Sequence, residues 1–269
     1  MLSSTLPRRQ QSYPKVINAS RWRRRVCTRR IARGTRVFLG CDGDLCHDGG
    51  MSFDWDPFVD LHTPAGNTEM SPLLVMFHGY GADEKDLMPV ASQLPPQFTV
   101  ASIRAPFEQG PGYTWFPLVN DPAFDFDVVK AVVDRLIVWL EEMKEKQDTI
   151  VLLGFSMGMA IATSLMRRRP DLITAVVGLS GFALDAALDP AQNYFDDSSL
   201  KHLKLPLFWG RDQQDPVITE DKVEYTNQWA RSHIQLTKIN YAGMGHGIAP
   251  QEISHVGEFL NAEVFGARL

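Results

Sequence analysis

Long apolar runs are missing from this sequence, and cysteine is scarce. No apolar stretch approaches the about 20 residues that a membrane-spanning helix needs, so we expect no transmembrane segment. The 269 residues include three cysteines, and all of them precede Met51. The rest of the chain therefore has neither a disulfide nor a cysteine nucleophile. The spacing of Cys27, Cys41 and Cys46 with His47 matches no familiar zinc pattern, and we predict no metal site and no cofactor.

A periodic arrangement of glycine or proline is also absent, which excludes a fibrous protein. Hydrophobic residues make up 44% of the chain and charged residues 22%, an ordinary balance for a folded globular protein. A chain of this length can bury a large core within one α/β domain. The composition therefore favours a single globular domain over a disordered chain.

Acidic residues are few at the start of the chain and in excess afterwards. Of 27 basic and 32 acidic residues, 11 basic and three acidic ones precede Met51, which leaves 16 basic and 29 acidic residues in the remainder. That remainder has a net charge of −13 and repels phosphate, so we expect no nucleic-acid partner for it. The same charge favours uncharged or hydrophobic substrates over anionic ones.

The break in charge and cysteine content predicts a boundary between residues 1–50 and residues 51–269. Residues 1–50 lack the apolar core of a secretory signal and read as a basic tail without stable structure. Three interpretations stay open: translated upstream sequence with Met51 as the natural start, an organelle transit peptide, or an arm that binds nucleic acid or a membrane surface.

Residues 51–269 alternate short apolar runs with amphipathic segments. The clearest helix lies near the middle, where Val129, Val132, Val133 and Leu136 form one apolar stripe. We predict strands at 73–77, 98–103, 149–155, 173–179, 205–209 and 234–241, and helices at 83–94, 126–146, 157–168 and 250–264. This alternation predicts an α/β fold with a mostly parallel sheet and helices on both faces.

The sharpest local signal is the pattern G-x-S-x-G at residues 154–158, between a predicted strand and a predicted helix. A serine on such a sharp turn needs small neighbours two residues away on either side. The turn holds the hydroxyl above the sheet and next to the helix N-terminus. We therefore predict Ser156 as a nucleophile.

A serine hydroxyl is a weak nucleophile and needs a base, and in hydrolases with this turn the partners follow in the order serine, acid, histidine. His246 follows the last predicted strand in a glycine-rich loop and is the expected base, whereas His233 and His255 read as surface histidines. Asp212 and Asp215 both follow the preceding strand. We favour Asp215 as the acid because a proline comes directly after it. Asp212 stays a rival, its alternative role being a turn aspartate beside Arg211.

The tetrahedral intermediate of such a reaction needs hydrogen-bond donors for its oxyanion. One predicted donor is the backbone N–H of Met157, the residue after the nucleophile. The other comes from His78-Gly79-Tyr80-Gly81, which follows an early strand, with the N–H of Tyr80 as the expected group. We expect His78 to brace this loop rather than to take a proton.

Four motifs in this order resemble the phospholipase/carboxylesterase family, the small α/β-hydrolases that include bacterial carboxylesterases and acyl-protein thioesterases. They are Phe77 to Asp83, Gly154 to Gly158, Asp215 to Ile218 and Gly245-His246. The resemblance covers most of residues 51–269 and implies an α/β-hydrolase fold. It also implies Ser156, Asp215 and His246 as a catalytic triad, with Tyr80 and Met157 as oxyanion donors.

The resemblance extends to residues 113–116, which look like the family's aromatic loop near the acyl pocket. It implies substrate contacts for Tyr113, Trp115 and Phe116. Two residues depart from the family: Met157 and Met159 stand where Gln and Gly are often found. The first change keeps the backbone N–H, and the second narrows the space behind the nucleophile.

The sequence therefore predicts a cytoplasmic serine carboxylesterase whose catalytic domain spans residues 51–269. We expect minimal or no lid, because residues 180–204 lack a long amphipathic helix. Alternative functions are an acyl-protein thioesterase or lysophospholipase, which needs the same groups, and a catalytically dead hydrolase fold that serves as a binding module. The expected partner is a small-molecule or acyl ester.

Overall fold

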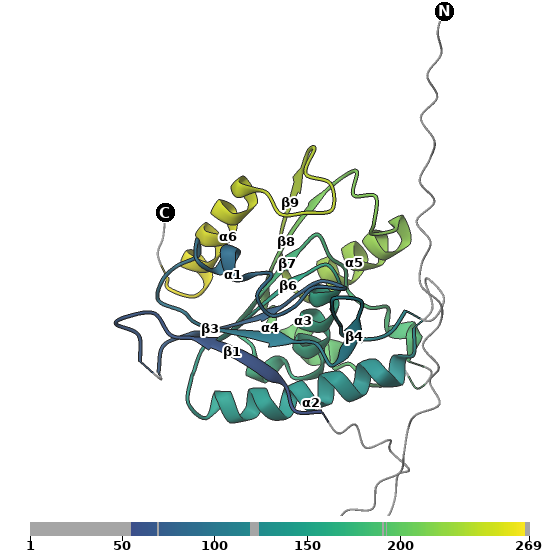
Figure 1. Cartoon of the computed structure of the whole chain (residues 1–269). Coiled ribbons are helices and arrows are strands. Elements are labelled where there is room, and N and C mark those ends of the chain that lie inside the picture. Colours follow the sequence, from purple (N-terminus) through teal and green to yellow (C-terminus); the bar gives the residue numbers. More distant parts are fainter. Residues whose placement is uncertain (1–54, 69, 119–123, 190, 192, 267–269) are drawn as a thin grey trace, which may run out of the picture. The chain divides into compact units, whose positions relative to one another are not determined.

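A computed structural model of the chain describes residues 55–68, 70–118, 124–189, 191 and 193–266 (Figure 1). All of them belong to the compact unit Met51–Leu269. The predictions for the basic tail, its lack of stable structure included, concern residues outside the described ones. Within the described residues, no helix combines the length and apolar character that crossing a bilayer requires.

The centre of the fold is a seven-stranded sheet with the strand order β1-β3-β2-β6-β7-β8-β9 (Figure 1). Its neighbours pair in parallel except β1, which lies antiparallel to β3 at one edge. The strands are β1 Phe58–His62, β2 Leu73–Phe77, β3 Thr99–Arg104, β6 Ile150–Phe155, β7 Ala175–Leu179, β8 Pro206–Asp212 and β9 Gln235–Tyr241. The predicted mostly parallel sheet is confirmed.

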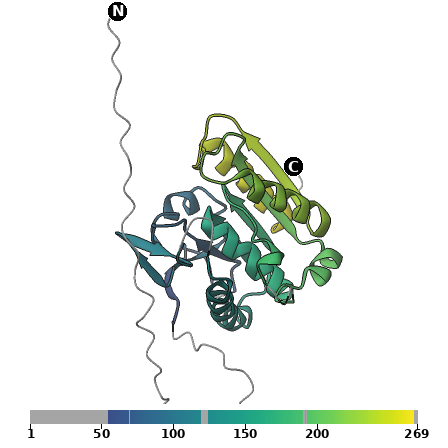
Figure 2. The same cartoon turned by 90° about the vertical axis from the view of Figure 1, so that its right-hand side faces the viewer.

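Helices cover both faces of this sheet, as predicted (Figure 2). On one face lie α2, α3, α4 and α5, and on the other lie α1 and α6. The helices are α1 Met88–Ala91, α2 Phe126–Lys144, α3 Met157–Arg168, α4 Asp197–Leu203, α5 Glu220–His233 and α6 Pro250–Glu263, with 3₁₀ turns at Pro170–Leu172 (η1) and Ala186–Leu188 (η2).

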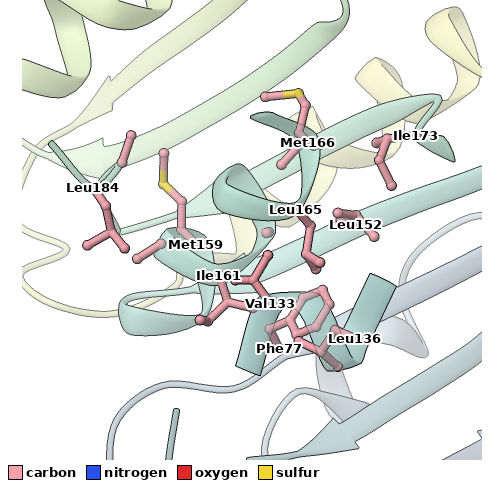
Figure 3. Packing of buried hydrophobic residues seen from close by; sticks show 14 of the residues in the cluster. Phe77, Val133, Leu136, Leu152, Met159, Ile161, Leu165, Met166, Ile173 and Leu184 are labelled. Atoms are coloured by element: carbon pink, nitrogen blue, oxygen red, sulfur yellow. The ribbon is translucent and has the colours of Figure 1, made fainter. Parts of the chain in front are cut away.

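The larger hydrophobic cluster lies between the sheet, α2 and α3 (Figure 3). Val133 and Leu136 of α2 point toward Phe77 of β2, and Leu165 of α3 lies beside Leu152 of β6. The apolar stripe predicted for the middle helix is fully buried. The cluster fixes α3 on the sheet, and with it the turn that carries Ser156.

A small hairpin lies apart from the main sheet. It pairs β4, Phe107–Gln109, with β5, Gly112–Thr114. The hairpin is joined to the loop after β2 by two backbone hydrogen bonds, from Gly81 N–H to Tyr113 O and from Tyr113 N–H to Ala82 O, each 2.8 Å long. It thus supports the loop in which the sequence places an oxyanion donor.

The structure corrects some of the predicted elements. The helix expected over 83–94 is regular only in α1, because Asp83 accepts a hydrogen bond from the Lys85 N–H and begins a turn instead. The sequence analysis assigned neither β1 nor the hairpin nor α5. In α5 the buried residues are Thr226, Trp229 and Ala230, too few apolar positions for a clear stripe.

Residues 180–204 contain η2 and the seven-residue α4 in their described part. Asp197 of α4 binds Arg167 near the carboxyl end of α3, through N–H groups 2.6 and 2.8 Å from its oxygens. Ser156 lies at the other end of α3. The described helix of this segment is therefore held away from the nucleophile, in agreement with the expectation of a minimal lid.

Candidate active site

Ser156 lies on a strained turn between β6 and α3. Its φ is 54° and its ψ −119°, a backbone conformation that residues other than glycine rarely adopt. The backbone passes so close to its neighbours that a Cβ on Gly158 would lie 1.9 Å from Phe77 O, and one on Gly154 would lie 2.3 Å from the Gly158 carbonyl. The two glycines of the motif are thus required by close packing. The turn is fixed further by a 2.9 Å hydrogen bond from Ser156 N–H to Leu179 O.

The structure brings Ser156, His246 and Asp215 together. The Ser156 Oγ and His246 Nε2 atoms are 2.9 Å apart, and His246 Nδ1 is 2.9 Å from Asp215 Oδ2. With the ring proton on Nδ1, the imidazole donates to Asp215 and accepts from the serine hydroxyl. The side chain of Asp215 is buried while that of His246 is 18% exposed, so the acid is shielded and the base remains accessible.

The two candidate acids have separate partners. The second oxygen of Asp215, Oδ1, accepts the N–H groups of Val217 at 2.8 Å and Ile218 at 3.3 Å, which fixes its orientation. Asp212 contacts the backbone before His246 instead: its Oδ2 accepts the Gly245 N–H at 2.7 Å. The rival acid of the sequence analysis therefore binds the backbone of the loop that carries the imidazole, whereas Asp215 binds the ring itself.

The loop after β2 runs directly past the nucleophile. A Cβ on Gly79 would lie 3.6 Å from Ser156 Cβ. His78 Nδ1 lies 2.7 Å from Gly79 O, and its Nε2 accepts the Ala105 N–H at 3.1 Å, so the ring spans the loop and a neighbouring strand end. Burial lowers the pKa of His78, which keeps the ring neutral. These contacts match the bracing role expected for His78.

The predicted oxyanion donors belong to two segments, the start of α3 and the loop after β2. Met157 is the first residue of α3, and the first N–H groups of an α-helix have no acceptor within the helix. Tyr80 follows Gly79 in the loop that passes the nucleophile, and its side chain is 44% exposed. Their role as donors stays a prediction.

The predicted aromatic loop is mostly part of the core. Trp115 and Phe116 are 0% and 1% exposed, and Trp115 Nε1 donates a 2.8 Å hydrogen bond to His78 O. Tyr113 is half-buried, with the Arg104 guanidinium 4.8 Å from its ring centre. Substrate contact by these three residues stays a prediction. The hydrogen bonds of Trp115 and Tyr113 support the loop after β2.

The other two downstream histidines have structural contacts. His233 Nδ1 lies 2.7 Å from Trp229 O within α5, and His255 Nδ1 lies 2.9 Å from the Tyr241 hydroxyl. The His233 ring is thus held within its own helix, and the His255 ring is held by the last residue of β9. In the described part of the chain, no three His, Cys, Asp or Glu side chains are grouped to hold a metal ion.

Burial shifts the pKa of two further ionisable groups, Glu252 and Arg211. Glu252 of α6 is 0% exposed, and burial raises its pKa to about 7. Burial also lowers the pKa of Arg211, although the nearby carboxylates of Asp215 and Asp212 oppose this shift. Of these two groups, Arg211 is the one that interacts electrostatically with Asp215 and Asp212.

The sequence analysis missed one further contact of the site. Ser180, which follows β7, donates a 2.8 Å hydrogen bond from its Oγ to Gly247 O, the residue after His246. It is completely buried and has a φ of 44°. The only hint in the sequence is its position at the end of a predicted strand, which does not reveal a partner 67 residues away.

Comparison with known proteins shows the family of the chain. The family model described as Phospholipase/Carboxylesterase matches residues 61–264, which include all the residues described above for the site. Acyl-protein thioesterase 1 of Saccharomyces cerevisiae is 27% identical over 165 residues, which are 54% of this chain and 66% of that protein. The chain thus spans somewhat less than two thirds of this relative.

A second relative and a solved structure extend the comparison. The putative hydrolase MhqD of Bacillus subtilis is 21% identical over 197 residues, 71% of this chain and 94% of that protein. The crystal structure of the Bacillus cereus carboxylesterase superposes with a TM-score of 0.64 at 18% identity, covering 78% of this chain and 96% of the other. At that identity, the structural likeness shows a common fold.

Proposed function

The chain belongs to the phospholipase/carboxylesterase family, whose matched relatives are hydrolases of the esterase and thioesterase type, and from this premise we propose that it is a serine carboxylesterase. The observation that carries the proposal is the pair of 2.9 Å hydrogen bonds that connect Ser156, His246 and Asp215. Such an arrangement can activate a serine hydroxyl for attack on a carbonyl carbon.

In the proposed reaction, Ser156 Oγ attacks the ester carbonyl and passes its proton to His246 Nε2. Asp215 accepts the Nδ1–H bond throughout, holds the imidazole in the required tautomer and stabilises the imidazolium. The N–H groups of Met157 and Tyr80 stabilise the oxyanion. The imidazolium then protonates the alcohol as it leaves, and an acyl-enzyme remains.

Hydrolysis of the acyl-enzyme repeats these steps with water as the nucleophile. His246 takes a proton from water, hydroxide adds to the acyl carbon, and the tetrahedral intermediate collapses to release the carboxylic acid and to reprotonate Ser156. The net acidic charge of residues 51–269 supports uncharged acyl esters as the substrate class. The proposal keeps the expected cytoplasmic location, which fractionation of cells that produce the full chain would test.

A second candidate is a thioesterase that acts on acylated proteins, because one relative is named acyl-protein thioesterase 1. The test uses purified full chain with p-nitrophenyl esters of increasing acyl length and with the matching acyl thioesters, and Ser156→Ala as the control. We expect turnover of the esters by the wild-type protein and none above background by the variant. Preference for thioesters at equal acyl length would favour the second candidate. No turnover of either series would refute both.

A further inference from the structure

The segment that carries His246 has little intrinsic order. We define the histidine loop as residues 242–249, between β9 and α6. It contains three glycines, and two of them, Gly243 and Gly245, have positive φ angles of 75° and 64°. Glycine-rich backbone has many accessible conformations. The position of the imidazole therefore depends on contacts that the loop receives from other elements.

On the amino side of His246, the contact comes from Asp212 at the end of β8. Its side chain is 2% exposed, its Oδ1 accepts the Gln214 N–H at 2.8 Å, and its Oδ2 accepts the Gly245 N–H at 2.7 Å. These backbone N–H groups, that of Gln214 first, lower the pKa of Asp212. One carboxylate thus joins the loop that contains Asp215 to the histidine loop.

On the carboxyl side of His246, the contact comes from Ser180 at the end of β7. Its Oγ donates to Gly247 O at 2.8 Å, and its own N–H donates to Gly210 O at 2.8 Å, which ties it to β8. Asp212 and Ser180 therefore bind backbone groups of the residues on either side of His246, the N–H of Gly245 and the C=O of Gly247. Both are anchored to β8, because Asp212 is its last residue and Ser180 is hydrogen-bonded to Gly210 within it.

We propose that Asp212 and Ser180 form a clamp on the histidine loop and are positioning residues for His246. This inference rests on the proposed function, in which His246 is the base. Neither residue touches the reacting atoms. The clamp fixes the backbone of His246, whereas Asp215 fixes the ring, and both constraints are needed to keep Nε2 within 2.9 Å of Ser156 Oγ.

The clamp predicts a specific kinetic effect. A displacement of about 1 Å in a catalytic group costs about 100-fold in rate. Loss of one clamp contact should therefore lower kcat by about 10- to 100-fold. KM should stay within about twofold, because the proposed mechanism gives neither side chain a contact with substrate.

Three variants separate the contributions of Asp212 and Ser180 to the position of His246. Asp212→Asn keeps the shape of the side chain but leaves one oxygen for two backbone N–H groups, and Asp212→Ala leaves none. Ser180→Ala removes the hydroxyl that binds Gly247 and keeps the Cβ at a positive φ. We expect kcat to fall in the order wild type, Asp212→Asn, Asp212→Ala, with Ser180→Ala also below wild type.

The second measurement is hydrogen–deuterium exchange of the full chain, followed by mass spectrometry of peptides that cover 242–249. It requires no substrate. The clamp predicts faster exchange in these peptides for all three variants, while peptides from β2, β6 and α3 exchange as in the wild type.

The matched control is Asp196→Asn, which also removes a carboxylate that accepts a backbone N–H, that of Ser199 at 3.0 Å. Asp196 N–H binds Arg167 O, so this site lies eleven residues along α3 from Ser156, a distance of about 16 Å. We expect a lower thermal midpoint in the control with unchanged kcat and unchanged exchange in 242–249.

Together, kcat and hydrogen–deuterium exchange distinguish a failure of the clamp from a failure of the proposed function. Absence of turnover in the wild type would refute the proposed function, and the exchange data would still test the clamp. Exchange in 242–249 that matches the wild type in the Asp212 and Ser180 variants would overturn the clamp. It would also be overturned by unchanged kcat in those variants, or by equal losses of kcat in the Asp196 control.

Discussion

The buried carboxyl of Glu252 makes stability depend on pH near neutrality. Its side chain is completely buried at the start of α6, and a Cβ on Gly210 would lie 2.0 Å from its Oε1. That oxygen has no hydrogen-bond partner among the described residues, and Oε2 has only the Ala249 N–H at 3.4 Å. The charge of Glu252 also adds to the effect of burial in raising the pKa of Tyr241 above its usual range. Burial thus removes this carboxyl from water, and the described residues give it one long hydrogen bond in return.

The magnitude follows from the shift. Burial raises the pKa of Glu252 from 4.5 to about 7, so the folded state binds the proton more tightly than the unfolded state. Ionisation of the buried carboxyl lowers the unfolding free energy. This loss is absent below the pKa of Glu252 in the unfolded state, grows as pH rises, and is complete above its pKa in the folded state. A difference of this size corresponds to about 3 kcal/mol of lost unfolding free energy above about pH 7.

The test compares wild type with Glu252→Gln, which removes the ionisable group and keeps the shape. Urea denaturation at about pH 5 and about pH 8.5 gives the unfolding free energies. As pH rises, the unfolding free energy of the variant should increase relative to that of the wild type, by up to about 3 kcal/mol. Glu258→Gln is the matched control, because Glu258 is exposed on the same helix. Parallel pH profiles for wild type and Glu252→Gln would refute the reasoning.

Three further predictions concern the triad, the turn and the core. Asp215→Asn should fold normally and lose about 10⁴-fold in kcat for ester hydrolysis, more than any clamp variant; a loss smaller than that of Asp212→Asn would reverse the two roles. Gly158→Ala would place a Cβ 1.9 Å from Phe77 O, so α3 must shift, and both the thermal midpoint and kcat should fall; wild-type values of both would contradict the packing. Arg167→Leu leaves Asp197 without its completely buried partner and should lower the unfolding free energy in urea denaturation by about 3 kcal/mol, whereas Arg169→Leu, which removes a 34% exposed side chain from an ion pair with the 59% exposed Asp171, should lower it by less than about 1 kcal/mol. Equal effects of the two would contradict that assignment.

Features with local sequence signals could be predicted. One continuous segment contains the apolar run of β6, the glycines on either side of Ser156 and the start of α3. Each of these features can be recognised from residues close to it in the sequence. The stripe of α2 has the helical period and is buried as expected. Local propensity and packing agree in these elements, so a short window contains enough information.

Features decided by distant contacts could not be predicted in the same way. The strand β1 exists because it pairs with β3, about forty residues later in the chain, and its own residues are partly exposed. The expected helix over 83–94 is interrupted because Glu84 forms an ion pair with Arg104 and Asp83 begins a turn. These outcomes depend on tertiary partners that no local pattern specifies.

The site shows the same division. Two aspartates three residues apart lie at the end of β8 and in the loop after it, and each directs one oxygen to that loop and one to the histidine loop. Residue type and spacing alone leave them equivalent, and the proline after Asp215 and the family resemblance favoured one of them. The contact of Ser180 with Gly247 crosses from β7 to the loop after β9 and has no counterpart in sequence pattern.

The central claim is that Ser156 is the nucleophile, and covalent labelling tests it most directly. The purified full chain is treated with a fluorophosphonate, digested, and analysed by mass spectrometry to locate the adduct. We predict one phosphonyl group on Ser156 in the wild type, with loss of ester hydrolysis in proportion to labelling, and no adduct on a Ser156→Ala variant that keeps the wild-type thermal midpoint. An adduct on another residue, or wild-type hydrolysis by Ser156→Ala, would contradict the account.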